Sequence, residues 1–77
     1  MANSVFTDYL KTLAGYSEAV DDGKVTDTDF LEYQKLEGRI RKAYQTGYFT
    51  QRQYDSLTAA YYDIKDGFRI ILGLERG

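Results

Sequence analysis

The side chains best suited to chemistry in this sequence are carboxylates, and four of them crowd one turn. Asp21, Asp22, Asp27 and Asp29 flank Gly23. Carboxylate oxygens are the ligands that Ca²⁺ prefers in proteins. Acids at a helix start are also stabilised by the positive end of the helix dipole. The cluster therefore has two interpretations, a cation loop or a capped turn between two helices.

The string DDGKVTDTDF resembles the second half of the calcium loop of EF-hand and dockerin proteins. Such a loop needs oxygen ligands at its first, third, fifth and twelfth positions. Those positions fall here on Glu18, Val20, Asp22 and Asp29. Valine cannot bind a cation, and the corresponding turn at Gly47 offers no carboxylate. We therefore expect helix capping, with no metal site and no cofactor.

Histidine, cysteine and tryptophan are absent from the chain. Their absence removes the usual general base, the thiolate nucleophile and the best transition-metal ligands. Paired carboxylates such as Asp63 and Asp66 can do acid–base work, but nothing in their spacing sets them apart. We therefore expect a protein that is not an enzyme. A chain without cysteine fits a reducing compartment, so we expect a cytoplasmic location.

The length and composition are those of one small globular domain. The chain has 77 residues, of which 43% are hydrophobic and 29% charged. This apolar content is too high for the disordered class. No stretch approaches the roughly 18 apolar residues of a membrane span, and we see no targeting segment. We expect no membrane partner. A core this small gives modest stability, so self-association is a candidate.

Two helix starts are marked by the same four-residue pattern. Thr26-x-x-Asp29 and Thr50-x-x-Gln53 have the spacing of a capping box, in which the first and fourth residues bond each other's backbone N–H groups. Each pattern follows a glycine by three residues, Gly23 and Gly47. Glycine adopts the left-handed conformation that ends many helices. Two helix–turn–helix junctions follow from these signals.

Apolar residues then recur at three- and four-residue spacing in three segments, which predicts an all-α three-helix bundle. The helices are expected at about 4–20, 27–46 and 51–74, in a single domain over 1–77. The residues expected to face the core are Phe6, Tyr9, Leu10, Leu13, Tyr16, Val20, Phe30, Tyr33, Leu36, Ile40, Ala43, Tyr44, Tyr54, Leu57, Tyr61, Ile64, Phe68 and Ile71.

Glycines within the helices complicate this pattern. The third helix either continues past Asp66-Gly67 or stops there, with a short fourth helical segment after Gly67. Gly15 and Gly38 lie inside the other two helices, where each costs about 1 kcal/mol relative to alanine. Close helix approach is one explanation for them, and chance is another.

The third helix is apolar on two sides. Tyr62 and Ile70 project about 130° and 150° from its core stripe, and Ala59 lies between them in direction. Tyr48 sits in the preceding turn. Exposed aromatic anchors are typical of interfaces. We therefore expect a small adaptor, inhibitor or modulator, of the kind that phages and mobile elements encode, which docks on a protein partner or a second copy through these four residues.

A basic stripe supports the alternative function. Lys35, Arg39 and Lys42 recur on the face of the second helix opposite its core, and Lys65, Arg69 and Arg76 are a second candidate stripe. Lysine and arginine rows of this kind bind phosphates. Residues 1–34 hold seven acids and two bases, however, which disfavours a general polyanion binder. The alternative is a nucleic-acid- or nucleoid-associated modulator.

A resemblance bears on the same alternative. The stretch VTDTDFLEYQKLEGRIRKAY, with TDYL earlier, resembles the Hha/YmoA family of small helical modulators, which bind nucleoid-structuring proteins. The resemblance covers about 20 residues. Glu37, Gly38 and Arg39 stand where that family has its central acidic-histidine-arginine signature. The family's signature is therefore not present here, and the resemblance implies a small helical protein that binds a nucleoid-structuring protein.

Overall fold

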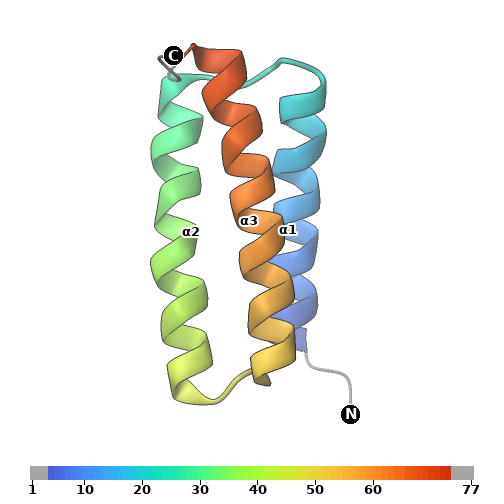
Figure 1. Cartoon of the computed structure of the whole chain (residues 1–77), viewed down its shortest axis with the longest axis vertical. Helices are drawn as coiled ribbons and strands as arrows, with labels where there is room; N and C mark the ends of the chain where they lie inside the picture. Colours follow the sequence, from blue (N-terminus) through green and yellow to red (C-terminus); the bar gives the residue numbers. More distant parts are fainter. Residues whose placement is uncertain (1–3, 74–77) are drawn as a thin grey trace.

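Three α-helices joined by two short turns make up the part of the chain that the computed structural model describes, residues 4–73. Helix α1 spans Ser4–Asp21, α2 spans Asp27–Thr46 and α3 spans Gln51–Leu72 (Figure 1). No strand occurs in this range. The predicted all-α three-helix bundle is confirmed, and the bounds of α2 are those predicted. The end predicted for the third helix, residue 74, lies outside the described residues.

Both capping boxes form as predicted. The side-chain oxygen of Thr26 accepts a hydrogen bond from the Asp29 N–H at 3.2 Å, and the Asp29 carboxylate accepts one from the Thr26 N–H at 2.9 Å. Thr50 and Gln53 exchange the same two bonds at 3.2 and 3.0 Å. Gly47 ends α2 with φ at 95°, in the left-handed region that only glycine enters cheaply. Local signals therefore fix both helix junctions.

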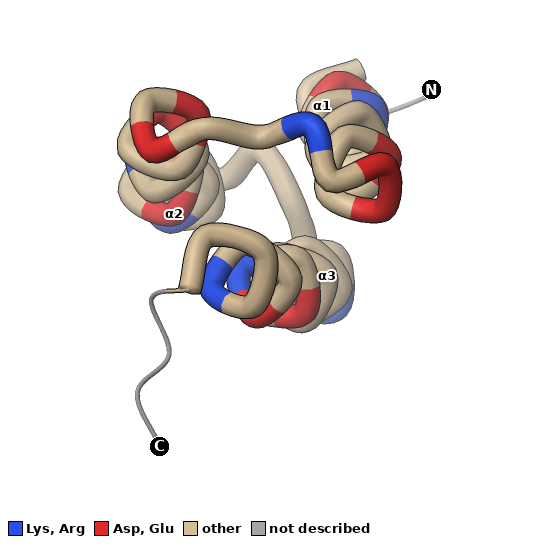
Figure 2. Tube along the Cα trace, turned by 90° about the horizontal axis from the view of Figure 1, so that it is seen from above, with Lys and Arg blue, Asp and Glu red and all other residues tan. Residues whose placement is uncertain are grey.

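Helix α3 packs against both other helices, and α1 and α2 contact each other much less. Figure 2, seen along the helices, shows the three at the corners of a triangle. This arrangement leaves α3 with two packed sides and one side turned outward.

No helix in the described residues is both long and apolar enough to cross a membrane.

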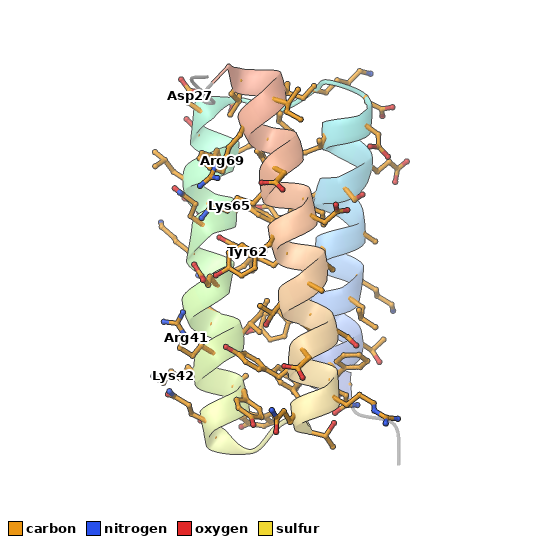
Figure 3. All side chains as sticks on the ribbon, viewed as in Figure 1. Asp27, Arg41, Lys42, Tyr62, Lys65 and Arg69 are labelled. Carbon is orange, nitrogen blue, oxygen red and sulfur yellow. The ribbon has the colours of Figure 1, made fainter. Side chains whose placement is uncertain are left out.

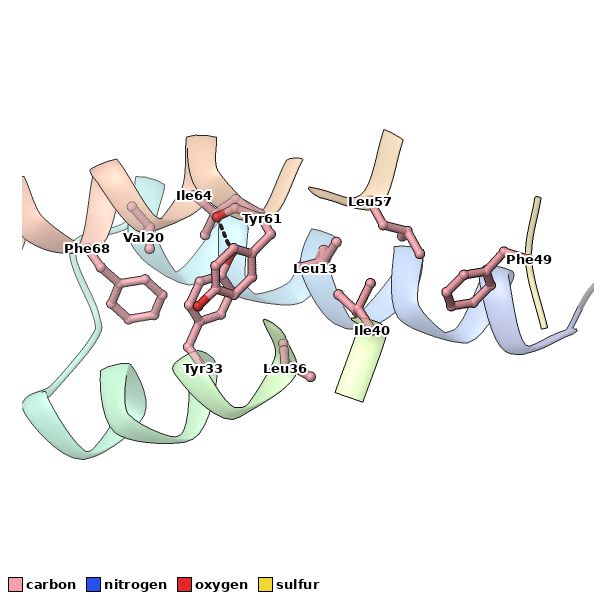
Figure 4. Packing of buried hydrophobic residues seen from close by; sticks show 10 residues of the cluster. All are labelled: Leu13, Val20, Tyr33, Leu36, Ile40, Phe49, Leu57, Tyr61, Ile64 and Phe68. Atoms are coloured by element: carbon pink, nitrogen blue, oxygen red, sulfur yellow. Dashed lines mark hydrogen bonds between the residues drawn. The ribbon is translucent and has the colours of Figure 1, made fainter. Parts of the chain in front are cut away.

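The core consists of ten buried side chains drawn from all three helices and from the α2–α3 turn (Figure 4). Phe49 is the core residue that comes from the turn. It was not predicted, because the apolar periodicity of the helices does not extend to a turn. Its ring makes T-shaped contacts with the rings of Phe6 and Tyr9, at centroid distances of 6.3 and 6.0 Å. The ten residues are Leu13, Val20, Tyr33, Leu36, Ile40, Phe49, Leu57, Tyr61, Ile64 and Phe68.

Two residues predicted in the core are exposed. Leu10 is 40% exposed and Ile71 is 44% exposed. Ile71 lies in the last turn of α3, where Leu72 and not Ile71 packs against the core. Leu10 lies on the outer rim of the α1–α3 contact, beside Ala14 and Asp63. The prediction was wrong at these positions because periodicity assigns a direction but not the reach of the neighbouring helix.

Gly67 neither ends nor interrupts α3. The helix continues through it to Leu72, so a stop or a separate fourth segment at this point is wrong. A Cβ on Gly67 would lie 2.6 Å from the Cγ1 of Val20 in α1, whereas one on Gly15 or Gly38 would meet nothing within 4 Å. Close helix approach therefore explains Gly67 and not the two glycines to which the sequence pointed.

Six of the eight tyrosines pack in or against the core, as predicted: Tyr9, Tyr16, Tyr33, Tyr44, Tyr54 and Tyr61. The rings of Tyr33 and Tyr61 stack at a centroid distance of 4.7 Å, and those of Tyr44 and Tyr54 stack at 4.3 Å. The buried Tyr33 hydroxyl donates to the backbone carbonyl of Tyr61 at 2.6 Å. Aromatic contacts thus join α2 to α3 along most of their length.

Candidate functional site

Tyr62 is the one aromatic side chain of α3 that is exposed to solvent. It is 44% exposed and lies on the side of α3 that faces α2 (Figure 3). Its hydroxyl donates a hydrogen bond to the Glu37 carboxylate. The same carboxylate pairs with Arg41, one helical turn further along α2, at 3.5 Å. Glu37 therefore holds both Arg41 and Tyr62 at the boundary between the two helices.

Two cations lie along α3 beside Tyr62. Figure 3 shows Arg69, Lys65 and Tyr62 one above another on the side of α3 that faces α2. The Nζ of Lys65 is 5.7 Å from the centre of the Tyr62 ring and 5.9 Å from that of Tyr61, within the range of cation–π attraction. Lys65 and Arg69 are half-buried, and in residues 4–73 neither pairs with a carboxylate. We call Glu37, Arg41, Tyr62, Lys65 and Arg69 the Tyr62 face.

A small depression of about 40 Å³ lies under the Tyr62 face, and Tyr54, Thr58 and Tyr61 contribute to its lining. The hydroxyl of Tyr61 is buried and finds no hydrogen-bond partner among the described residues. Burial, with the negative charge of Glu37 adding to it, raises the pKa of Tyr61 to about 12, and the positive charge of Arg69 opposes the change. The depression is too small for an organic ligand, since such pockets measure about 300 Å³ or more.

The Tyr62 face offers hydrogen-bond donors and positive charge at neutral pH. The hydrogen bond to Glu37 raises the pKa of Tyr62 above its ordinary value, and burial adds to the effect. A phenol with a raised pKa stays protonated near pH 7, so it donates a hydrogen bond and does not act as a nucleophile. Among residues 4–73, no group of three or more histidine, cysteine, aspartate or glutamate side chains is placed to hold a metal ion. The hydrogen-bond donors and positive charges of the Tyr62 face are suited to binding.

Ala59 and Ile70 lie on the outward side of α3. Both are exposed, and Ile70, at 68%, is the most exposed of the large apolar side chains in residues 4–73. At about 100° per residue the two project in nearly the same direction, and Tyr62 projects about 60 to 80° from them. Asp66, also exposed, lies one turn from both Tyr62 and Ile70. The structure thus brings Ala59 and Ile70 to one strip of α3, with Tyr62 at its edge.

Tyr48 lies apart from these three residues, at the α2–α3 turn, and is 53% exposed. It lines a shallow hollow together with Tyr9, Arg39 and Lys42. The structure therefore places Tyr48 with the basic stripe and not with Ile70. Lys35, the third residue of that stripe, pairs with Glu32 at 3.3 Å. Arg76 of the second predicted stripe lies outside the described residues.

No protein-family model, no curated protein and no solved structure matches the chain.

Glu37 and Lys65 were not predicted as contacts of Tyr62, although the sequence placed Glu37 one turn from Arg41. Their convergence depends on how α2 and α3 align across the turn, which single-helix periodicity does not give. Function is therefore inferred from the geometry of the Tyr62 face and its surroundings.

Proposed function

We propose that this chain is a small helical interaction module, an adaptor, inhibitor or modulator that docks on another protein through α3. One observation carries the proposal. Tyr62 and Ile70 are 44% and 68% exposed, although α3 already buries four apolar side chains in its contacts with α1 and α2. Exposed aromatic and aliphatic side chains grouped on one element mark binding surfaces. A binding partner would cover this second apolar side of α3.

One partner can cover both anchors. Tyr62 and Ile70 are eight residues apart, which is about 12 Å along the helix axis. An interface of standard size covers about 800 Å² on each partner, which is ample for that separation. The small side chain of Ala59 leaves room for a neighbouring helix to approach. A cytoplasmic location fits a chain without cysteine, and a second copy of this chain is one candidate partner.

The test is capture of binding proteins from the organism that encodes the chain, with point variants as bait. Tyr62→Asp and Ile70→Asp are expected to abolish capture of the same proteins. Leu31→Asp is the matched control, because Leu31 is 61% exposed but lies on α2. Circular dichroism melts establish that each variant is folded, and sedimentation shows whether the wild type self-associates. Capture that survives both α3 variants would overturn the proposal.

A second candidate function has its own observation, the hollow that joins Tyr48 and Tyr9 to Arg39 and Lys42. Proteins that bind single-stranded nucleic acid stack bases on aromatic rings and hold phosphates with cations. A gel shift with a single-stranded oligonucleotide tests it at two salt concentrations. Phosphate binding must weaken steeply as salt rises, and Arg39→Gln with Lys42→Gln must abolish it. The absence of a shift at low salt would exclude this function.

A further inference from the structure

Lys65 and Arg69 are the two half-buried cations of residues 4–73, since every other lysine and arginine in that range is exposed. Neither pairs with a carboxylate in that range. Long basic side chains bury their apolar stems and keep their charged groups in water, so both charges stay open to an external anion. The Lys65 ammonium also lies within cation–π range of the Tyr61 and Tyr62 rings. Both cations are thus placed to gain from an external anion.

The remaining members of the Tyr62 face do not supply that anion. The Glu37 carboxylate is already engaged by Arg41 and by the Tyr62 hydroxyl. With Glu37 and Arg41 offsetting each other, the face keeps the positive charges of Lys65 and Arg69 around an exposed aromatic ring. The face combines positive charge with an apolar anchor.

We propose that the Tyr62 face binds an acidic segment of the partner protein, with carboxylates against Lys65 and Arg69 and an apolar side chain against the Tyr62 ring. The inference rests on the proposed function and names the chemistry of the partner. A carboxylate that approaches these two cations forms charge-assisted hydrogen bonds, which are about twice as strong as neutral ones. Complementary charge also fixes the orientation of docking.

The surroundings favour a peptide over a nucleic acid. Asp66 is exposed on α3 between Lys65 and Arg69 in sequence, and Glu37 lies within the face itself. A nucleic-acid strand carries a phosphate at every nucleotide and must pass these acids, whereas a peptide can place two carboxylates where the cations are. The net charge of the chain is −2, which further disfavours a polyanion.

The experiment selects binders from an unbiased displayed library of random peptides, using the wild-type chain as target. Clones whose binding is lost with Tyr62→Ala, which removes the ring without adding a charge, are sequenced and synthesised as single peptides. We expect these peptides to be enriched in aspartate and glutamate over the starting library. The double variant Lys65→Gln, Arg69→Gln should weaken their binding by about tenfold or more. Arg39→Gln with Lys42→Gln, which removes the same charge elsewhere, should leave it unchanged.

Further controls show whether a loss of binding comes from the lost charge or from unfolding, and whether nucleic acid binds the same face. Lys65→Arg keeps the positive charge and must retain binding, and circular dichroism melts must show all variants folded. A single-stranded oligonucleotide must not compete with the peptides for the wild type. Any one of four results would overturn the inference. The selected peptides could lack acidic enrichment, or their binding could be insensitive to the Lys65 and Arg69 double variant. The oligonucleotide could compete with them, or no clone could depend on Tyr62. The proposed function falls separately, when capture of cellular proteins survives Tyr62→Asp and Ile70→Asp.

Discussion

Gly67 in α3 and Val20 in α1 lie so close that there is no room for a methyl group between them. A Cβ on Gly67 would lie 2.6 Å from the Cγ1 of Val20, a distance that real Cβ atoms essentially never show. Val20 is buried, and its branched side chain has one strongly preferred rotamer in a helix. The spacing of α1 and α3 at this level therefore requires a glycine.

Gly67→Ala should destabilise the protein although alanine is the better helix former. Replacing glycine by alanine in a helix gains about 1 kcal/mol, but overpacking a core typically costs about 1–3 kcal/mol. The free energy of unfolding, measured by urea denaturation, should fall. Gly38→Ala is the matched control, because its Cβ meets nothing within 4 Å, and it should raise the free energy of unfolding.

A double variant distinguishes the steric cause. Val20→Ala removes the Cγ1 atom that Gly67→Ala would meet, so the two substitutions together should cost less than the sum of their separate effects. Coupling between residues in contact commonly amounts to about 0.5–3 kcal/mol. Additive effects, or a stabilising Gly67→Ala, would show that α1 and α3 are not this close in solution.

The sequence predicts those parts of the fold that depend on neighbours along the chain. A capping box is formed by residues three apart, so Thr26-x-x-Asp29 located the start of α2 correctly. Gly67 shows where such reasoning ends. As a poor helix former it favoured a break, but its role is set by Val20, which is 47 positions away in the sequence. Contacts between helices depend on their alignment, which one helix alone does not encode.

The same distinction applies to the candidate site. Helical geometry alone indicated that Tyr62 and Ile70 point away from the core stripe, and both are exposed. It did not reveal that Glu37 of α2 meets the Tyr62 hydroxyl, because that contact depends on how the α2–α3 turn aligns the two helices. Nor did it reveal that Tyr48 joins Arg39 and Lys42 in one hollow.

Thr50→Ala should lower the free energy of unfolding by about 1 kcal/mol, the usual cost of losing a helix N-cap. The substitution removes the oxygen that accepts the Gln53 N–H and so breaks the capping box of α3. Urea denaturation measures the effect. Thr46→Ala is the control, because the exposed Thr46 hydroxyl only donates to the Lys42 carbonyl within α2 and should matter little. Equal effects of the two substitutions would contradict the role assigned to the cap.

Tyr33→Phe and Tyr61→Phe should differ although both remove a buried hydroxyl. The Tyr33 hydroxyl donates to the Tyr61 carbonyl at 2.6 Å, and losing such a bond costs about 0.5–1.5 kcal/mol. The Tyr61 hydroxyl has no partner among the described residues, so its removal should be neutral or stabilising. Thermal or urea unfolding of the two variants makes the comparison. A larger loss for Tyr61→Phe would show that its hydroxyl is bonded in solution.

Stability should fall in alkaline solution because two buried tyrosines resist ionisation. Burial, with the negative charge of Glu37 adding to it, raises the pKa of Tyr61 from 10.0 to about 12, and burial also raises the pKa of Tyr33. In the unfolded chain both phenols ionise near the ordinary value, so the unfolded state loses protons first. The contribution to stability is therefore fully present below pH 10 and is lost as pH rises through the folded-state values.

Urea midpoints measured from about pH 8 to pH 11, on either side of the ordinary tyrosine pKa, should decline at the alkaline end. Tyr61→Phe removes one of the two phenols and should flatten the decline, whereas Thr50→Ala should shift the whole curve without changing its slope, because Thr50 does not ionise. Tyrosinate absorbance gives an independent readout, since Tyr33 and Tyr61 should ionise only as the protein unfolds. Full ionisation of every tyrosine near the ordinary pKa while the helices stay folded would contradict their burial.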